Sequence, residues 1–473
     1  MRKEDEVEEM TAKTNSVLTF LQQDQEIIHL QDILQQKQEL AIYGLYEGQR
    51  TLVTAALFDS RQTDCLLAIC DTSKRAKELW EDLSQLLPED DVLYFPALEM
   101  IPYEVLAQSN ELECKRVEVL TRLLQVQAGK RTIVVTVMDS LSKKLLPPAM
   151  LRQGIKTLRV GDVVEPEQLR KYLVDYGYEG VEQVEQPGQF AVRGGIVDIY
   201  SPRENNPVRL EFFDDEVDSV RPFDVKTQCS IEKIQEFTLV PAREFFLTDE
   251  QRQHGMVQIR EEFAQQLEQL KGKKNREPIE RLQSKVGELL EKLQQGLYFP
   301  GIEQYQNYFF PQAVSLLDYL PANCLVVLDE ANRIQEAEEH QQKERLNSFA
   351  DLLAKGSVLP GQSEYFYDLN SLASILQQPE HICFSLLPKA SVFQWETNKM
   401  YTVECQTIPP FFGNPQLLLD ELRNWKRLNY RVIILLTSIT KGQRLQQMLE
   451  ENDLTATWID SPKYAAPAHI YYR

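Results

Sequence analysis

Short apolar runs alternate with helix-like segments along the first third of the chain, and this alternation limits the possible folds more than any other feature. The apolar runs, which are typical of buried strands, cover residues 51–58, 65–70, 92–95 and 132–138. Between them, residues 73–87 and 111–127 have the apolar spacing of amphipathic helices. Such alternation favours an open, mostly parallel α/β sheet. The run CLVVLDE at residues 324–330 predicts that this sheet resumes after an insertion.

The insertion contains a β-rich segment, residues 158–240, whose clearest part is GQFAVRGGIVDIYSPRENNPVRLEFFDDEVDSVRPFD at residues 188–224. Its short runs are rich in β-branched and aromatic residues and are separated by turn residues, which predicts an antiparallel sheet. Gly194 and Gly195 permit a bulge or a close backbone approach, and residues 201–207 form a hairpin connection. The segment therefore predicts a small β-rich domain.

Two further regions follow the β-rich domain. Residues 249–295 are charged and helical in spacing, and Gly272 and Pro278 divide them into a predicted helical hairpin. From residue 405, a helix at 415–428, a strand at 431–438 and a second helix at 443–452 predict a small α/β unit. Since the last residues, HIYYR, look like the middle of a strand, we expect a longer parent protein. The predicted domains are 1–155, 156–240, 241–404 and 405–473.

The length and charge of the chain narrow its possible functions. A chain of 473 residues is too long for one core, and its net charge of −21 opposes tight binding to a phosphate backbone. No apolar run reaches the length of a membrane span and the charged N-terminus does not resemble a signal peptide, so we expect a cytoplasmic protein without a membrane partner. The seven cysteines form no CxxC pair and the five histidines are dispersed, which predicts reduced thiols and no metal site.

A damaged phosphate-binding loop follows the strand-like residues AIY. The pattern GxxxxGK[ST] cradles phosphate with backbone N–H groups, while its Lys reaches the phosphate oxygens and its Ser or Thr binds Mg²⁺. Here the first glycine, Gly44, and the final Thr51 are kept, but Gln49 replaces the second glycine and Arg50 replaces the lysine. Glu47 adds a negative charge. We therefore expect a degenerate P-loop NTPase-like fold without nucleotide, Mg²⁺ or catalytic residues of its own.

The partner motif of such a fold is better preserved. LVVLDEAN contains a hydrophobic strand that ends in Asp329 and Glu330, the acids that hold Mg²⁺ and orient water in active NTPases. A strand that ends in two acids is weak evidence alone, because many strands end this way for helix capping or solubility. An intact second motif beside a broken first one indicates a nucleotide fold that is used as a scaffold.

Three residues of the β-rich segment predict a surface that binds a partner. Arg193 and Arg209 lie inside apolar strand runs, where a planar guanidinium needs a carboxylate. Phe213 follows Phe212, and because neighbouring strand residues face opposite sides, the two rings cannot enter one core. A two-sided aromatic beside arginines is typical of an interface hot spot. The alternative is that both arginines form internal ion pairs with Asp214, Asp215 or Glu216.

These motifs closely resemble those of the bacterial transcription-repair coupling factor family, Mfd, in its N-terminal UvrB-like region. AVRGGIVDIY and VRLEFFDDEVDSVRPFD resemble the family's UvrA-binding domain, and FPALEMIPYE, IVVTVMDSLSKKLLPP and GYEGVEQVEQPG follow the family's order. The resemblance implies that Arg193, Arg209 and Phe213 contact the repair protein UvrA. It also implies a degenerate phosphate loop in this region.

The resemblance implies a role in nucleotide excision repair, in which the chain recruits UvrA to RNA polymerase stalled at DNA damage. It further implies that a C-terminal half of the parent protein binds RNA polymerase and, with ATP and Mg²⁺, translocates on double-stranded DNA. The alternative is an ATP-dependent damage-recognition subunit of the UvrB type. That reading requires phosphate binding despite Gln49 and Arg50, and an aromatic β-hairpin for which the residues after 95 leave no room.

Overall fold

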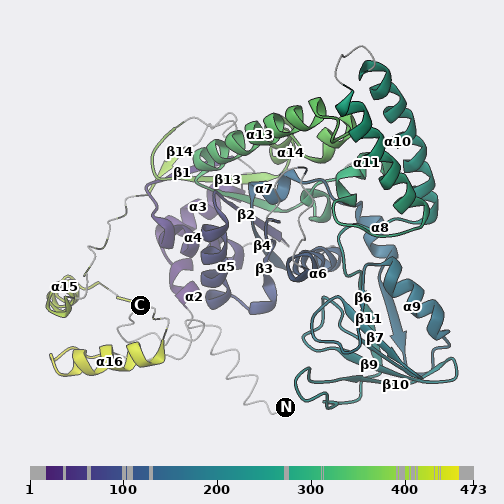
Figure 1. Cartoon of the computed structure of the whole chain (residues 1–473). Coiled ribbons are helices and arrows are strands. Elements are labelled where there is room, and N and C mark those ends of the chain that lie inside the picture. The colour runs from purple at the N-terminus through teal and green to yellow at the C-terminus, as the bar shows by residue number, and fades with distance from the viewer. Residues whose placement is uncertain are drawn as a thin grey trace.

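The computed structural model in Figure 1 shows a large α/β body, a β-rich domain, a helical hairpin and a pair of C-terminal helices. The residues that the structure describes are 17–35, 39–60, 65–98, 103, 110–126, 131–270, 276–310, 312, 314–389, 393, 400–403, 405, 408, 411, 414–430, 432–434, 436 and 438–456.

The α/β body contains a seven-stranded sheet whose order is β14-β1-β13-β12-β2-β4-β3, and its hydrogen-bonded strand pairs are parallel. Its strands are β1 Leu40–Tyr43, β2 Cys65–Cys70, β3 Val92–Tyr94, β4 Thr132–Val137, β12 Leu325–Asp329, β13 Glu380–Ser385 and β14 Met400–Thr402. Because β12 lies between β13 and β2, the prediction that the sheet resumes after the insertion is confirmed.

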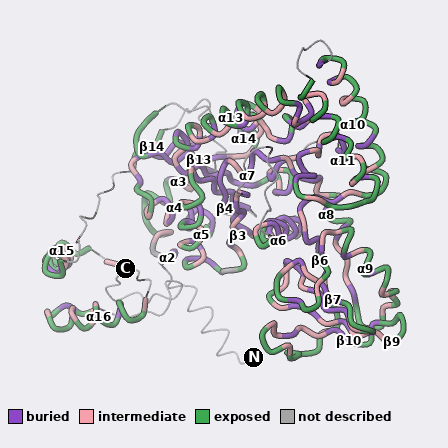
Figure 2. The backbone as a smooth tube through the Cα atoms, in the orientation of Figure 1, coloured by how far each residue is buried: buried purple, intermediate pink, exposed green. Residues whose placement is uncertain are grey.

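Helices cover both faces of this sheet, which explains why its strands are apolar throughout. In β2, Leu67 and Ile69 join one hydrophobic cluster, whereas Leu66 and Ala68 join the other. One face is covered by α2 Val17–Gln22, α3 Gln25–Gln35, α4 Glu47–Ser60 and α5 Ser73–Leu86, and the other by α6 Asn110–Val126, α7 Met138–Ser142, α13 Ala331–Ala354 and α14 Leu369–Leu376. The strands are the buried centre of the body in Figure 2.

The predicted strand at residues 51–58 is wrong, because these residues form most of helix α4. Arg50, Thr51 and all residues from Val53 to Phe58 are buried, so the helix shows almost no polar face. A buried helix and a buried strand both give a continuous apolar run, and periodicity does not separate them.

The β-rich domain is built around a five-stranded sheet with the order β10-β9-β8-β7-β6. Its strands are β6 Glu179–Gly180, β7 Gln189–Arg193, β8 Ile196–Ile199, β9 Val208–Phe213 and β10 Glu216–Pro222. Strands β7 to β10 pair antiparallel, and Gly194, with a φ of 60°, lies in the tight turn between β7 and β8. The two strands β5 Lys156–Arg159 and β11 Glu236–Leu239 form a separate ladder. Helix α9 Pro166–Asp175 packs on the domain through Leu169 and Leu173, whereas Leu151 of α8 Pro148–Gln153 joins a hydrophobic cluster of the α/β body. The predicted antiparallel sheet is confirmed.

A buried ion pair anchors the segment that leaves the β-rich domain. Arg116, on α6, donates hydrogen bonds to Glu244 and to the carbonyl oxygen of Pro96, and its guanidinium lies over the ring of Phe95. The side chain of Arg116 is completely buried. Nearby, the thiol of Cys114 donates to the carbonyl oxygen of Ala242. The two domains are therefore joined by buried polar contacts as well as by the chain.

The predicted helical hairpin is confirmed as α10 Asp249–Leu270 and α11 Glu277–Gln294, which pack against each other. Pro278 lies in the first turn of α11, where its missing N–H removes no helical hydrogen bond. Gly272 lies outside the described residues. The remaining short helices are η1 Glu89–Asp91, η2 Ile302–Tyr305, α12 Gln306–Phe309, η3 Leu316–Tyr319 and η4 Pro360–Tyr365.

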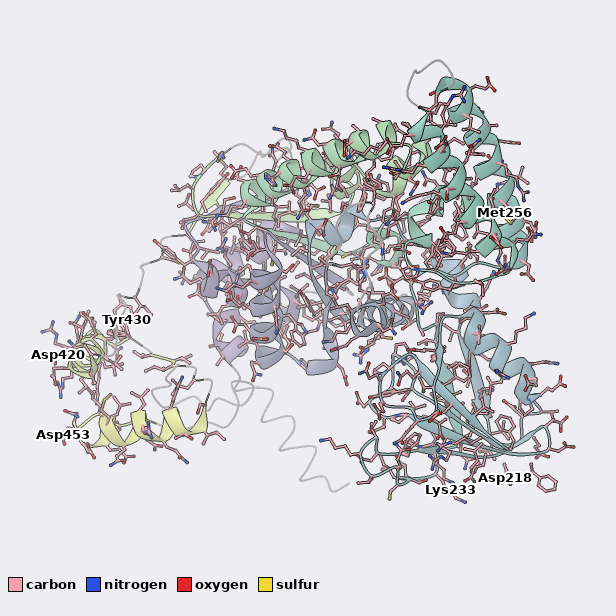
Figure 3. All side chains as sticks on the ribbon, in the orientation of Figure 1. Asp218, Lys233, Met256, Asp420, Tyr430 and Asp453 are labelled. Atoms are coloured by element: carbon pink, nitrogen blue, oxygen red, sulfur yellow. The ribbon has the colours of Figure 1, made fainter. Side chains whose placement is uncertain are left out.

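The C-terminal region contains α15 Pro415–Arg427 and α16 Ile439–Glu450, which share a small cluster around Leu419, Leu422 and Leu449. Figure 3 marks this region by Asp420, Tyr430 and Asp453, and Asp218 and Lys233 mark the β-rich domain. The predicted strand at 431–438 is not found: its described residues, 432–434, 436 and 438, have no strand structure. A strand needs a hydrogen-bonded neighbour, and the described residues from 405 to 456 supply none.

Across the described parts of the chain, no helix combines the length and the apolar character that crossing a membrane requires.

Candidate functional site

The five-stranded sheet has one apolar face and one charged face, because its residues alternate across the pleat. Leu210 and Val220 belong to the hydrophobic cluster of the domain, and Phe212 packs against it. On the opposite face, the register of strands β7 to β10 brings charged residues of neighbouring strands together. We call it the charged face, and its residues are Arg193, Ile196, Asp198, Arg209, Glu211, Phe213, Glu216, Ser219 and Arg221. All three predicted partner-binding residues lie on this face.

Asp198 joins the two predicted arginines. The Arg209 side chain binds it with a fork, in which Nε donates to Oδ1 at 2.7 Å and Nη2 donates to Oδ2 at 2.9 Å. Nη2 of Arg193 donates to Oδ2 at 2.6 Å. The Asp198 side chain is only 1% exposed, whereas those of Arg209 and Arg193 are 19% and 52% exposed. The cluster therefore has one buried carboxylate and two guanidinium groups of unequal exposure.

Asp198 is the partner of both arginines, in place of the expected internal partners Asp214, Asp215 and Glu216. Asp198 lies directly across from Arg209 in the β8–β9 ladder, whereas Asp214 and Asp215 lie in the turn between β9 and β10. The signal for Asp198 was present in the sequence, since it is the only acid inside the apolar run IVDI. An acid at that position in a central strand requires a cationic partner.

Arg209 is held on two sides. Its hydrogen bond to Asp198 raises its pKa above the usual arginine value. Its guanidinium also lies over the ring of Phe223, 4.6 Å from the ring centroid. A second ion pair follows on the same face, where Nη2 of Arg221 and the hydroxyl of Ser219 donate to Oε2 of Glu211 at 2.5 and 2.6 Å. Arg209 is thus mainly an internal residue of the sheet.

Phe213 is the most exposed large hydrophobic residue of the described chain, at 79% of its surface. It ends strand β9 and lies opposite Glu216. Phe212, one position earlier, packs against the core. The prediction that the two rings face opposite sides is confirmed. An aromatic ring in water on the same face as the half-exposed Arg193 gives a surface that a partner protein can favourably bury.

The degenerate phosphate loop lies between β1 and α4. Gly44 has a φ of +86°, and a Cβ there would lie 2.5 Å from the carbonyl oxygen of Val403. Oε1 of Gln49 accepts a hydrogen bond from the backbone N–H of Tyr46 at 2.9 Å. In an active loop, such N–H groups point at phosphate. Gln49 thus occupies a donor that a phosphate oxygen would need.

Arg50 closes the same site from the other side. Its Nη1 lies 2.8 Å from Oδ1 of Asp329 and 2.6 Å from Oε1 of Glu330, and all three side chains are largely buried. Nε of Arg75 donates to Oδ2 of Asp329 at 2.8 Å. The hydroxyl of Thr51 donates to the carbonyl oxygen of Glu47. The acids that hold Mg²⁺ in active NTPases therefore hold two arginines here, so the residues present do not fit a magnesium nucleotide.

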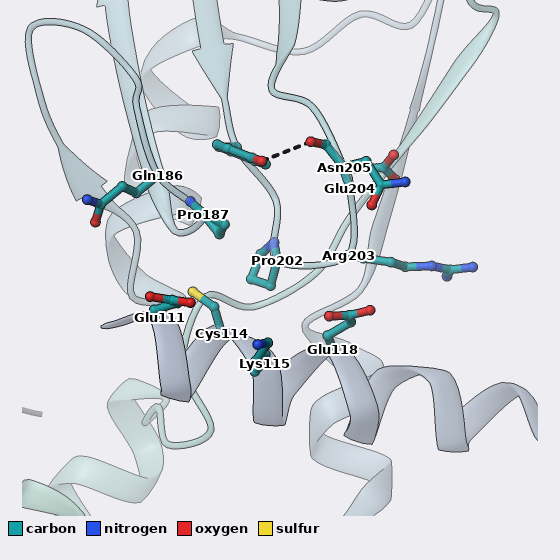
Figure 4. A pocket seen from close by; sticks show the side chains of 11 residues that line it. Glu111, Cys114, Lys115, Glu118, Gln186, Pro187, Pro202, Arg203, Glu204 and Asn205 are labelled. Carbon is teal, nitrogen blue, oxygen red and sulfur yellow. Dashed lines mark hydrogen bonds between the residues drawn. The ribbon is translucent and has the colours of Figure 1, made fainter. Parts of the chain in front are cut away.

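A cavity of about 340 Å³ lies between α6 and loops of the β-rich domain. Figure 4 shows Glu111, Cys114, Lys115 and Glu118 on the helix, and the opposite side is lined by Gln186, Pro187, Tyr200, Pro202, Arg203, Glu204 and Asn205. The hydroxyl of Tyr200 donates to the carbonyl oxygen of Asn205 at 2.9 Å. The lining mixes acidic and basic side chains, so it favours no single class of ligand.

No group of three or more His, Cys, Asp or Glu residues in the described ranges could hold a metal ion. No disulfide joins any of the seven cysteines, all of which lie in the described ranges, and Cys65, Cys70, Cys114, Cys324 and Cys383 are buried.

Comparison with known proteins gives a family match for the β-rich domain and relatives for most of the chain. Residues 157–245 match the family model of the UvrB interaction domain, and this range contains the whole charged face. The chain is 31% identical over 433 residues to the transcription-repair-coupling factor of Bacillus subtilis (strain 168), which covers 92% of this chain and 36% of that protein. The protein of the same name from Staphylococcus aureus (strain MRSA252) is 28% identical over 437 residues, with the same coverage.

The chain spans about 36% of the length of the curated relatives that it matches. The family match covers the β-rich domain, and the relatives cover nearly all of the chain. The resemblance indicated by the sequence motifs is thereby confirmed: the chain is similar over 92% of its length to transcription-repair-coupling factors, and its β-rich domain matches the UvrB interaction domain.

Proposed function

We propose that this chain is an interaction module of a transcription-repair coupling factor, and that its charged face docks the repair protein UvrA. In this role it recruits nucleotide excision repair to RNA polymerase stalled at DNA damage. The observation that supports the proposal most strongly is the exposed pair of Arg193 and Phe213 on one face of a domain that matches the UvrB interaction domain.

The two exposed residues offer different contributions to a complex. Phe213 supplies apolar area that is in water in the free chain, and burial of this area favours association. Arg193 uses one terminal nitrogen for Asp198, so its guanidinium keeps further donors for a partner carboxylate. Together they provide an apolar contact and a charged contact on one rigid sheet, which is the composition of an interface hot spot.

The α/β body serves as a scaffold in this proposal. Arg50 and Arg75 occupy the carboxylates of the former nucleotide site, which opposes ATP hydrolysis by this chain. ATP, Mg²⁺, double-stranded DNA and RNA polymerase are assigned to the part of the parent protein that this chain does not span. An ATP-dependent enzyme of the UvrB type is the competing proposal, and it requires that Arg50 release Asp329 and Glu330.

Calorimetric titration of the chain with purified UvrA tests the proposal. We expect saturable binding by the parent chain and, because Arg193 is exposed, a dissociation constant at least about tenfold higher for Arg193→Ala. Arg159→Ala is the matched control. Arg159 is also an exposed arginine of the same domain with one carboxylate partner, Glu236 at 3.0 Å, but it lies in the separate two-stranded ladder.

The parent chain and Arg159→Ala are expected to bind UvrA equally. Failure of the parent chain to bind UvrA, together with measurable affinity for ATP, would overturn the proposal in favour of the UvrB-type enzyme. Equal losses of affinity in both arginine variants would show that general positive charge, rather than the charged face, attracts UvrA.

A further inference from the structure

Asp198 is a buried acid at the centre of the proposed docking face, and it accepts hydrogen bonds from the exposed Arg193 and from the more buried Arg209. It lies in the middle strand of the sheet, opposite Ala191 on one side and Arg209 on the other. Arg193 is two positions along β7 from Ala191 and so shares the face. A carboxylate that is 1% exposed at such a place is costly unless it is paired.

The two arginines use this carboxylate unequally. Arg209 forms the bidentate fork and covers Phe223, so its guanidinium is fixed from two directions. Arg193 forms a single bond to Oδ2, the oxygen that also accepts from Arg209. Arg209 therefore holds Asp198 in place, and Asp198 in turn holds Arg193. More than half of the Arg193 side chain is still exposed to solvent.

We propose that Asp198 is a positioning residue, whose carboxylate orients the guanidinium of Arg193 toward a carboxylate of UvrA. The inference rests on the proposed function. Arg209 balances the charge of Asp198 through its fork, so the exposed donors of Arg193 stay available for an acidic partner. Because Asp198 fixes Arg193 before UvrA arrives, the complex loses less side-chain entropy when the ion pair forms.

Asp198→Asn is the direct test, since asparagine has the same shape and removes the negative charge. We expect the dissociation constant for UvrA to rise about tenfold, because Arg193 is then held by a neutral oxygen and is repelled by Arg209. Glu236→Gln is the matched control: it makes the same change of charge and breaks the Arg159–Glu236 pair of the same domain. We expect it to bind UvrA as the parent chain does.

A double variant separates positioning from a general effect on the fold. If Asp198 acts through Arg193, then Arg193→Ala in the Asp198→Asn background adds little further loss, and the two effects are not additive. Full additivity would overturn the proposal, and so would parent-like binding by Asp198→Asn. With either of these results, binding of UvrA by the unsubstituted chain would leave the proposed docking function intact. If the unsubstituted chain did not bind UvrA, both the docking function and the role of Asp198 would be overturned.

Arg193→Lys keeps the proposal testable if Asp198→Asn does not fold. Lysine retains the charge but lacks the planar fork that can contact two carboxylates at once. We expect this variant to lose most of the affinity that Arg193→Ala loses, with an unchanged melting temperature. Parent-like affinity of Arg193→Lys would show that orientation of the guanidinium is irrelevant and would overturn the role of Asp198.

Discussion

Replacement of Phe213 by alanine separates binding from folding more cleanly than any other change on the charged face. The ring is 79% exposed at the end of β9, and it belongs to no hydrophobic cluster of the described chain. Its removal therefore takes little from the folded state. In a complex that covers the charged face, the same ring leaves water.

The size of the effect follows from the exposed area. A phenylalanine side chain buries about 150–250 Å², so a ring that is 79% exposed has roughly 120–200 Å² left to bury. At about 25 cal/mol per Å², this area is worth about 3–5 kcal/mol as an upper bound. Because ordering of side chains at an interface opposes binding, we expect a loss of about 2–4 kcal/mol, or roughly 30-fold to 1000-fold in dissociation constant.

The assay combines calorimetric titration against UvrA with thermal unfolding of the free chain. Phe213→Ala should bind more weakly while its free energy of unfolding stays within about 0.5 kcal/mol of the parent, as is usual at surface positions. Phe212→Ala is the matched control, since the same atoms are removed one position earlier, where the ring packs against the core. We expect that variant to lower the melting temperature.

Two results would refute this reasoning. Unchanged affinity of Phe213→Ala for UvrA would show that the exposed ring lies outside the interface. A melting temperature that falls as far in Phe213→Ala as in Phe212→Ala would show that the ring supports the fold.

Two further predictions concern the α/β body. Arg50→Ala should lower the free energy of unfolding by about 3–5 kcal/mol in urea denaturation, because it leaves the buried Asp329 with one cationic partner fewer. The unsubstituted chain should show no rise in melting temperature with Mg²⁺-ATP, and a rise would contradict the closed site. Burial raises the pKa of Glu113 to about 7. Between about pH 4.5 and 7 the folded state therefore keeps a proton that the unfolded state has lost, so the contribution of Glu113 to stability falls as pH rises through this window. Glu113→Gln should remove up to about 3 kcal/mol of this decline in the free energy of unfolding between pH 5 and pH 8. An identical decline in the variant and in the unsubstituted chain would show that Glu113 does not titrate in this range.

The elements that the sequence predicted correctly are those with distinct local patterns. The runs at β2, β3, β4 and β12 are short, apolar and bounded by turns, and each is a parallel strand. The helical hairpin was visible because Pro278 interrupts its charged, periodic segment. The motif of the phosphate loop pointed to Arg50, whose side chain contacts Asp329 and Glu330 in the structure.

The errors arise where the environment, rather than the local pattern, decides. Residues 51–58 were predicted as a strand because α4 is covered on nearly all sides. Asp198 was missed because its role depends on register, which places it opposite Arg209 and one diagonal step from Arg193. The bonds from Arg50 to Asp329 and Glu330 join residues far apart in the sequence, so only the order of strands β1, β13 and β12 brings them together.

Arg50, Arg116 and Arg193 differ in exposure and in the contacts that they make. Arg50 and Arg116 are buried against acids, where each joins parts of the chain that are distant in sequence. Arg193 is more than half exposed and shares its acid with Arg209. In an active NTPase, nucleotide and Mg²⁺ make the contact that Arg50 makes here, and that contact changes with each hydrolysis cycle. The ion pairs of Arg50 occupy the acids that would take part in such a cycle. We therefore expect the α/β body to act as a scaffold that holds the β-rich domain, and the charged face to make the contact with a partner.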